Sequence, residues 1–221
     1  MDADPPLAWP AYRSTALRAP ARPPVPLPPG PAEQTGPVFG EGGVAAADAD
    51  LTAQHAVEPQ GERIIVHGRV LDADRRPVPH TLVEVWQANA AGRYRHDADR
   101  HPAPLDPNFT GAGRCLTDEA GRYRFVTIRP GAYPWKNSRN AWRPAHIHFS
   151  LFGRAFVQRL VTQMYFPGDP LLPHDAIATA VPEFARDRLV AALDLPESVP
   201  EWALAYRWDI VLRATPFEGP S

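Results

Sequence analysis

The sequence predicts a mainly β protein, an antiparallel β-sandwich with a proline-rich N-terminal arm and one or two short helices. Proline makes up 28 of the 221 residues, well above the usual share of about 5%, and proline interrupts helices. After residue 63, segments rich in β-branched and aromatic residues alternate with turn residues. Short strands separated by turns are typical of a sandwich rather than of alternating β–α units.

Residues 1–60 are expected to form the extended arm and a connection, and residues 61–221 the folded β-sandwich domain. Eleven prolines fall between Pro5 and Pro37, and the stretch 21–31 is expected to be polyproline-like. Apolar residues such as Trp9 and Tyr12 favour an arm that docks on a surface over a free tail. Residues 41–60 are expected to be a surface connection with a short helical turn.

Six segments carry the residue pattern of strands and are bounded by turn signals. They are 63–71, 81–87, 121–128, 145–151, 156–166 and 205–213. One helix is expected at 182–193, because Pro182 suits a first helical turn and four apolar residues can then share a face. Those four are Phe184, Leu189, Ala192 and Leu193.

Composition excludes several kinds of function. A formal net charge of −2 gives no electrostatic footprint for nucleic acid or for an anionic membrane. No stretch of about 18 apolar residues occurs, and the N-terminus lacks the features of a signal peptide, so a cytoplasmic location is expected. The single cysteine, Cys115, excludes an internal disulfide and a thiolate cluster. A metal would need His, Tyr or carboxylate ligands.

The sharpest local feature is His146-Ile147-His148. In a strand the two histidines point to one face and Ile147 to the other, which provides half of a metal site. Two half-buried, hydrogen-bonded histidines would look the same. The next residues, 149–156, contain no Glu, but aromatic and Arg-rich segments precede the pair, which makes Tyr94 and Tyr133 the candidate partners. A single Tyr is more often a core residue.

The motifs GRYRH (92–96), AYPWKNSRNAWRPAHIHFS (132–150) and GRCLTDEAGRYRF (113–125), taken together, resemble the intradiol ring-cleaving dioxygenases. Within that family they resemble the iron-bearing β chains that act on protocatechuate. The resemblance runs from about Gly61 to Arg213. The arm segment PAYRSTALRAP (10–20) is similar to the start of such β chains, though more loosely.

The resemblance implies a non-haem Fe(III) site with four protein ligands: Tyr94, Tyr133, His146 and His148. Phenolates are hard anionic oxygen donors that suit ferric iron, and imidazoles suit several metals. Two phenolates also offset much of the 3+ charge, which lets the ion lie inside a protein.

The resemblance assigns roles to further side chains around the iron. Tyr133 would leave the metal when substrate binds and accept a substrate proton. Arg143 would face the substrate ring and stabilise developing negative charge. Gln163 would lie near the open coordination position, and Trp135 and Tyr12 would border the substrate. The expected catalytic residues are thus Tyr133, Arg143 and Gln163, and the substrate-binding residues are Tyr12, Trp135 and Arg143.

The implied reaction is cleavage of protocatechuate with O2 to 3-carboxy-cis,cis-muconate, by a hetero-oligomer with a homologous α chain. A catechol or hydroxyquinol 1,2-dioxygenase would share every ligand, but those relatives carry a long helical N-terminal region, which the proline-rich arm argues against. A non-catalytic transthyretin-like binding module would fit the first strands equally well. It would leave the Tyr/Tyr/His/His set unexplained.

Overall fold

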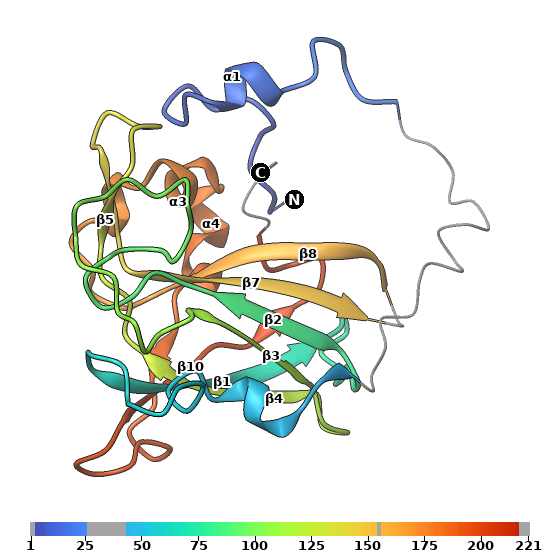
Figure 1. Ribbon diagram of the computed structural model, residues 1–221. Coiled ribbons are helices and arrows are strands. Elements are labelled where there is room, and N and C mark those ends of the chain that lie inside the picture. Colours follow the sequence, from blue (N-terminus) through green and yellow to red (C-terminus); the bar gives the residue numbers. More distant parts are fainter. Residues whose placement is uncertain (1–2, 26–42, 154–155, 217–221) are drawn as a thin grey trace.

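The computed structural model describes residues 3–25, 43–153 and 156–216. Two β-sheets face each other (Figure 1). One sheet is built around β1 (Arg63–Leu71), which pairs with β4 (Arg122–Ile128), β10 (Leu204–Arg207) and β11 (Ile210–Val211), and β10 pairs in turn with β9 (Ala192–Leu193). The other has the order β3 (Ala112–Leu116), β2 (Leu82–Trp86), β7 (His146–Gly153), β8 (Phe156–Tyr165). The predicted sandwich is confirmed.

The main core lies between the two sheets and draws its side chains from both. Ile64 of β1, Phe125 of β4 and Phe149 of β7 belong to it, and all three are at most 1% exposed. The rings of Phe125 and Phe149 meet edge to face at 6.3 Å, and Trp208 packs on Phe149 at 4.9 Å. Burial of this apolar surface is the main force that holds the sheets together.

Between the strands named above, pairing within the described residues is antiparallel except along one edge of β1. There β10 and β11 run parallel to β1, with Ile64 opposite Leu204 and Val70 opposite Ile210. The segment 205–213, which was predicted as one strand, forms the two strands β10 and β11. It breaks where the Asp209 carboxylate accepts the Arg69 N–H at 3.0 Å in place of a backbone carbonyl. The predictions also omitted β3, whose sequence AGRCL has little strand character.

The predicted helix at 182–193 is wrong in length. The helix α4 (Glu183–Arg186) is followed by a 3-10 turn, η4 (Asp187–Leu189), and Ala192–Leu193 form β9 instead. Of the expected apolar face only Leu189 is buried, whereas Phe184 and Leu193 are about half exposed. Pairing of β9 with β10 stops the helix, because those residues complete the sheet.

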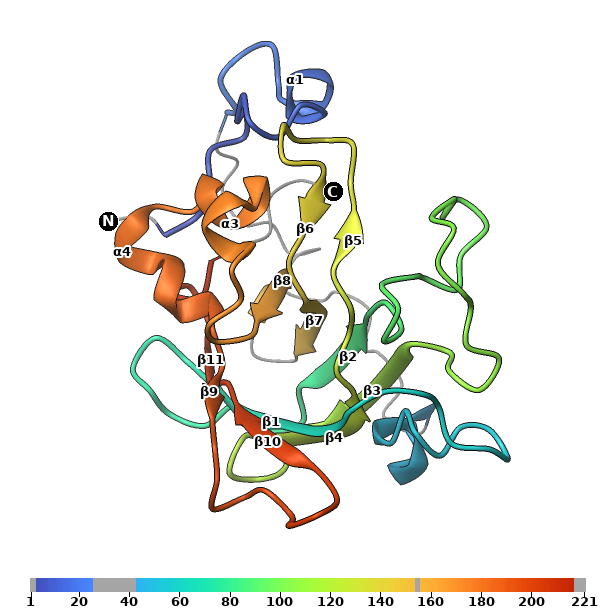
Figure 2. The ribbon, with the colours of Figure 1, turned by 90° about the vertical axis from the view of Figure 1, so that its left-hand side faces the viewer.

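A second short helix, α3 (Ala176–Ala180), was not predicted; it follows the 3-10 turn η3 (Leu172–His174). Together α3 and α4 cover the end of β8 on its outer side (Figure 2). Their small apolar side chains pack against Tyr165, which is fully buried. No helix in the described part of the chain is long and apolar enough to cross a membrane.

The N-terminal segment packs on the same chain. Its helix α1 (Thr15–Arg18) lies at the tip of a hairpin made of β5 (Tyr133–Pro134) and β6 (Trp142–Arg143) (Figure 2). Arg13 N–H donates to the Asn137 carbonyl at 2.9 Å. The predicted turn within 41–60 is the 3-10 helix η2 (Ala46–Ala49). The polyproline prediction for 21–31 falls, beyond residue 25, outside the described residues.

Candidate active site

The two histidines lie at the start of β7 and face away from the main core. His146 and His148 have ring centroids 4.9 Å apart, and Ile147 between them is a core residue that is 2% exposed. The expected alternation is thus present. His148 is additionally held by Trp86, opposite it on β2, whose ring stacks on the imidazole at 4.7 Å and 7°.

The neighbours of His146 fix which of its nitrogens carries the proton. Nδ1 lies 2.7 Å from the Pro144 carbonyl, and Nε2 lies 3.1 Å from Nη1 of Arg143. A guanidinium has only donors, so Nε2 must be the acceptor and Nδ1 the donor. Burial, with the nearby Arg143 and His148, lowers the pKa of His146 well below its ordinary value. The imidazole is therefore neutral with a lone pair at Nε2, as a metal ligand requires.

The two tyrosines come from loops that cross in backbone contact. A Cβ atom on Gly92, whose φ is +78°, would lie 2.1 Å from the Ala132 carbonyl oxygen, and one on Gly131 would lie 2.4 Å from that of Ala90. Only glycine at both positions allows so close an approach. The crossing brings Tyr94 and Tyr133 together, with ring centroids 5.3 Å apart.

Side chains within the Tyr94 loop fix its conformation. The Asn89 side-chain oxygen accepts the backbone N–H of Ala91 at 3.0 Å and that of Arg93 at 2.9 Å. The Asp99 carboxylate accepts the N–H of Tyr94 itself at 2.8 Å. Neither residue was predicted to matter, although Asn and Asp side chains commonly accept hydrogen bonds from backbone N–H groups two to four residues further on in turns.

All four predicted ligands converge on one centre. The ring of Tyr133 lies 5.5 Å from that of His146, and the ring of Tyr94 lies 6.3 Å from that of His148. Within the described ranges, no three His, Cys, Asp or Glu side chains are grouped so that they could hold a metal ion. A metal at this centre would therefore need the phenolic oxygens, and a set of two phenols and two imidazoles fits ferric iron.

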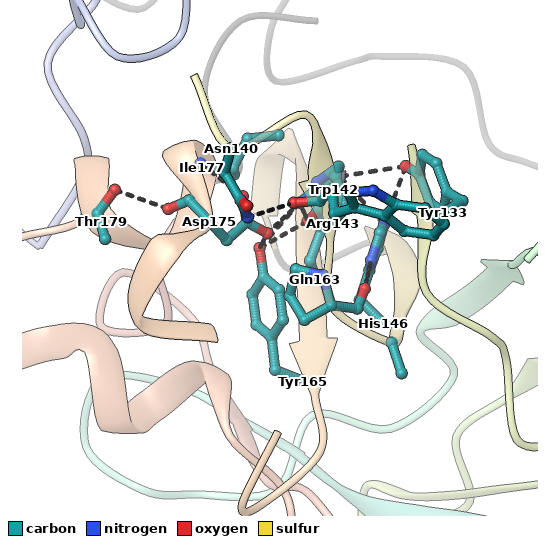
Figure 3. A network of polar contacts seen from close by, with 12 residues as sticks. Tyr133, Asn140, Trp142, Arg143, His146, Gln163, Tyr165, Asp175, Ile177 and Thr179 are labelled. Atoms are coloured by element: carbon teal, nitrogen blue, oxygen red, sulfur yellow. Dashed lines mark hydrogen bonds and ion pairs between the residues drawn. The ribbon is translucent and has the colours of Figure 1, made fainter. Parts of the chain in front are cut away.

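Arg143 points into this centre from the hairpin, where it pairs directly with Tyr133. Its Nη1 lies 3.4 Å from the Tyr133 hydroxyl, and its Nη2 donates to Gln163, Tyr165 and Asp175 (Figure 3). Burial alone would lower the pKa of Arg143, but the Asp175 carboxylate and the two phenols raise it well above its usual range. A cation is thus held permanently at the edge of the centre.

The remaining predicted residues surround Arg143. Its guanidinium carbon lies 5.2 Å from the centre of the Trp135 ring, and Tyr12 of the arm meets Trp135 edge to face at 4.8 Å. On the other side, Nε2 of Gln163 lies 3.4 Å from Nδ1 of His148. All eight residues singled out in the sequence therefore belong to one cluster.

Three residues of the cluster were not predicted: Trp86, Tyr165 and Asp175. Trp86 reaches His148 only through the register of β2 on β7, and Tyr165 reaches Arg143 through β8. Neither register can be read from local sequence. Asp175 directly before AIATA does carry the signal of a helix N-cap, and its side chain accepts the Ile177 N–H at 2.8 Å.

Comparison with known protein families identifies two matching segments. Residues 34–214 match the family described as "Dioxygenase", and residues 3–30 match "Protocatechuate 3,4-dioxygenase beta subunit N terminal". The chain is 60% identical over 215 residues to a protocatechuate 3,4-dioxygenase β chain from Burkholderia cepacia, an alignment that covers 95% of this chain and 91% of that protein.

More distant relatives are similar over a shorter part of their length. A hydroxyquinol 1,2-dioxygenase from Rhizobium sp. (strain MTP-10005) is 34% identical, over 60% of this chain and 47% of its own. The crystal structure of 3-chlorocatechol 1,2-dioxygenase from Rhodococcus opacus 1CP superposes with a TM-score of 0.58 at 27% identity, over 80% of this chain and 69% of that one. The chain belongs to the intradiol dioxygenase family, in the branch of the protocatechuate 3,4-dioxygenase β chains.

Proposed function

We propose that this chain is the iron-bearing β chain of a protocatechuate 3,4-dioxygenase, which cleaves protocatechuate with O2 to 3-carboxy-cis,cis-muconate. The observation that carries the proposal is the convergence of two tyrosine and two histidine rings beside a buried arginine. The 60% identity to a β chain of that name supports the substrate. Residues 61–221 would form the catalytic domain and residues 1–60 its arm and connection.

Tyr94, Tyr133, His146 and His148 would hold the iron, which the intradiol family uses in general as a non-haem cofactor. When bound, a ferric ion accepts electron density from a chelated catechol and so makes the ring reactive toward O2. The hydrogen bond from His146 to the Pro144 carbonyl fixes the orientation of the imidazole and increases its basicity. Two phenolates would offset most of the 3+ charge of a ferric ion.

The surrounding residues would handle the substrate. In its phenolate form Tyr133, whose oxygen lies beside Nη1 of Arg143, would take a proton from a catechol hydroxyl. Arg143 would stabilise the negative charge that develops on the ring, since it is fixed in a water-excluded position. Trp135 and Tyr12 would border the ring, and Gln163 would lie near the open coordination position through its contact with His148.

A homologous α chain would complete the enzyme as a hetero-oligomer and receive the substrate carboxylate. The name of the Burkholderia relative, a β chain, supports such a partner. Nucleic acid and membranes are not expected partners, because the net charge is only −2.

The proposal is tested by the colour of the iron-loaded protein and by the product that it forms from protocatechuate. The iron-loaded chain, co-expressed with its α chain, should be red-brown from tyrosinate-to-iron charge transfer, and anaerobic protocatechuate should shift the band. Tyr94→Phe should lose most of the band and activity, whereas Tyr206→Phe, a core residue of the other sheet, should keep both.

Four results would overturn the proposal. A colourless iron-loaded protein, or full activity in Tyr94→Phe, would contradict the assignment of the iron ligands. Strong turnover of plain catechol by this chain alone, without 3-carboxy-cis,cis-muconate from protocatechuate, would instead support a catechol or hydroxyquinol 1,2-dioxygenase. Reversible binding of a catechol without turnover would indicate the binding module.

A further inference from the structure

A buried carboxylate lies behind Arg143, on the side away from the predicted ligands (Figure 3). Oδ2 of Asp175 lies 2.8 Å from Nη2 of Arg143, and the two side chains are 0% and 3% exposed. We propose that Asp175, assisted by Tyr165, is a positioning residue that aims the Arg143 guanidinium at the active centre. The inference rests on the proposed function, because it concerns how that site is built.

The guanidinium has two ends with different surroundings. Nη2 donates to three oxygens, those of Gln163 at 2.6 Å, Tyr165 at 3.0 Å and Asp175 at 2.8 Å. Nη1 faces the Tyr133 hydroxyl and Nε2 of His146, while Nε has no hydrogen-bond partner among the described residues. Because the group is a rigid planar fork, the contacts at Nη2 determine where Nη1 points.

Asp175 can act as an anchor because it is itself fixed. Its Oδ1 accepts the Ile177 N–H at 2.8 Å and so caps α3. Its backbone carbonyl accepts the Thr179 hydroxyl at 2.6 Å and the Thr179 N–H at 2.9 Å. With Oδ1 committed to the helix, Oδ2 is left facing Arg143 and also accepts the Tyr165 hydroxyl at 3.1 Å.

Charge makes Asp175 different from the other two acceptors of Nη2. Gln163 is neutral and Tyr165 is a phenol, whereas Asp175 is the carboxylate that forms an ion pair with Arg143 within the described part of the chain. A buried cation that loses its counter-ion is strongly disfavoured, and it moves toward water or another anion. Loss of the Asp175 charge would therefore release the guanidinium from its present direction.

A purely structural role for Asp175, as the cap of α3, predicts a different outcome, and Asp175→Asn separates the two. Asn caps helices as well as Asp does but cannot neutralise Arg143. If Asp175 positions Arg143, Asp175→Asn should lower kcat about 10- to 100-fold with KM within about threefold, because a small misplacement weakens interactions made in the transition state. Iron content and the visible band should persist.

The matched control is Asp74→Asn. Asp74 also pairs with an arginine, Arg76, at 2.8 Å, but both side chains are largely exposed. This variant makes the same chemical change and should leave kcat unchanged. A wild-type kcat in Asp175→Asn would overturn the inference, whereas a colourless or inactive wild-type enzyme would overturn the proposed function instead.

A double-mutant comparison tests whether Asp175 acts through Arg143. Arg143→Gln alone should lower kcat, and Asp175→Asn added to it should lower kcat no further. Losses that multiply would show that Asp175 acts by another route. In the iron-free crystal structure of Asp175→Asn, the guanidinium should leave its contact with His146; an unmoved guanidinium would contradict the inference without any activity measurement.

Tyr165→Phe keeps the test decisive if Asp175→Asn does not fold. This change removes one acceptor of Nη2 and keeps the ring that packs against α3 and α4. The expected loss of kcat is about 3- to 10-fold, since one hydrogen bond to a charged group is removed. An unchanged kcat in a folded, iron-loaded Tyr165→Phe would contradict the proposed positioning of Arg143 by Asp175 and Tyr165.

Discussion

Both faces of β7 and β8 carry buried side chains, and the faces differ in what fills them. On the inner face, Ile147, Phe149 and Met164 are at most 2% exposed and pack in the core between the sheets. On the outer face, His146 and Gln163 are each 2% exposed and take part in a polar network with Arg143. Burial alone does not identify the functional face.

The two faces differ in the interactions that offset the free-energy cost of burying their side chains. The inner face is held by close packing, so a change in volume affects stability first. The outer face contains groups that would be costly to bury unless hydrogen-bonded or paired, and its polar contacts converge on one centre. Changes there should affect chemistry more than stability, and four variants or measurements can test this division.

The largest expected effect is on the inner face. Phe149→Ala should lower the free energy of unfolding by about 3–5 kcal/mol, because Phe149 is fully buried and its removal leaves a cavity. Urea denaturation measures the change. Iron content per folded molecule should stay the same, and a loss of iron parallel to the loss of stability would break the division between the faces.

On the outer face, His148→Ala should lower iron affinity at least about 100-fold, since even the partners of metal ligands contribute 10- to 100-fold. That factor corresponds to about 2.7 kcal/mol. Metal titration and the visible band report it. The control is Ile147→Val, the adjacent residue on the other face, which should cost about 0.5–1.5 kcal/mol of stability and leave the band intact.

The crossing of the two tyrosine loops should respond to Gly92→Ala with a loss of about 1–3 kcal/mol in stability and an altered band, because a Cβ would meet the Ala132 carbonyl. Gly168→Ala is the matched control. Gly168 also has a positive φ, +74°, but a Cβ atom on it would have no described atom within 4 Å. Equal effects from the two variants would mean that the close approach is unimportant.

The last prediction concerns a rate and not a stability or an affinity, at Cys115 on β3, which packs against the inner core. Burial raises the pKa of its thiol to about 12. Because only the thiolate reacts, thiol reagents at pH 8 should label the folded protein about 1,000-fold more slowly than the unfolded chain, and the rate should rise with pH up to that value. Rapid labelling at pH 8 would show that this edge of the core opens.

Local patterns predicted much of the fold. The bounds of β1 are those expected from residues 63–71, and the alternation in His146-Ile147-His148 placed both histidines on one face. The family motifs identified most of the residues in the candidate site. The missed features depend on contacts between distant segments: β3 is held partly by Leu51, which lies where a Cβ on Gly113 would be, and β9 replaces a helical turn by pairing with β10.

The parallel pairing of β1 with β10 and β11 bears on how the protein is made. β1 emerges early from the ribosome, but its edge partners follow 140 residues later, as in the Arg69–Asp209 contact. Contacts of such long sequence separation slow folding and are completed late. During synthesis the growing chain should thus expose an unfinished sheet edge until β10 and β11 appear, and unpaired strand edges favour aggregation.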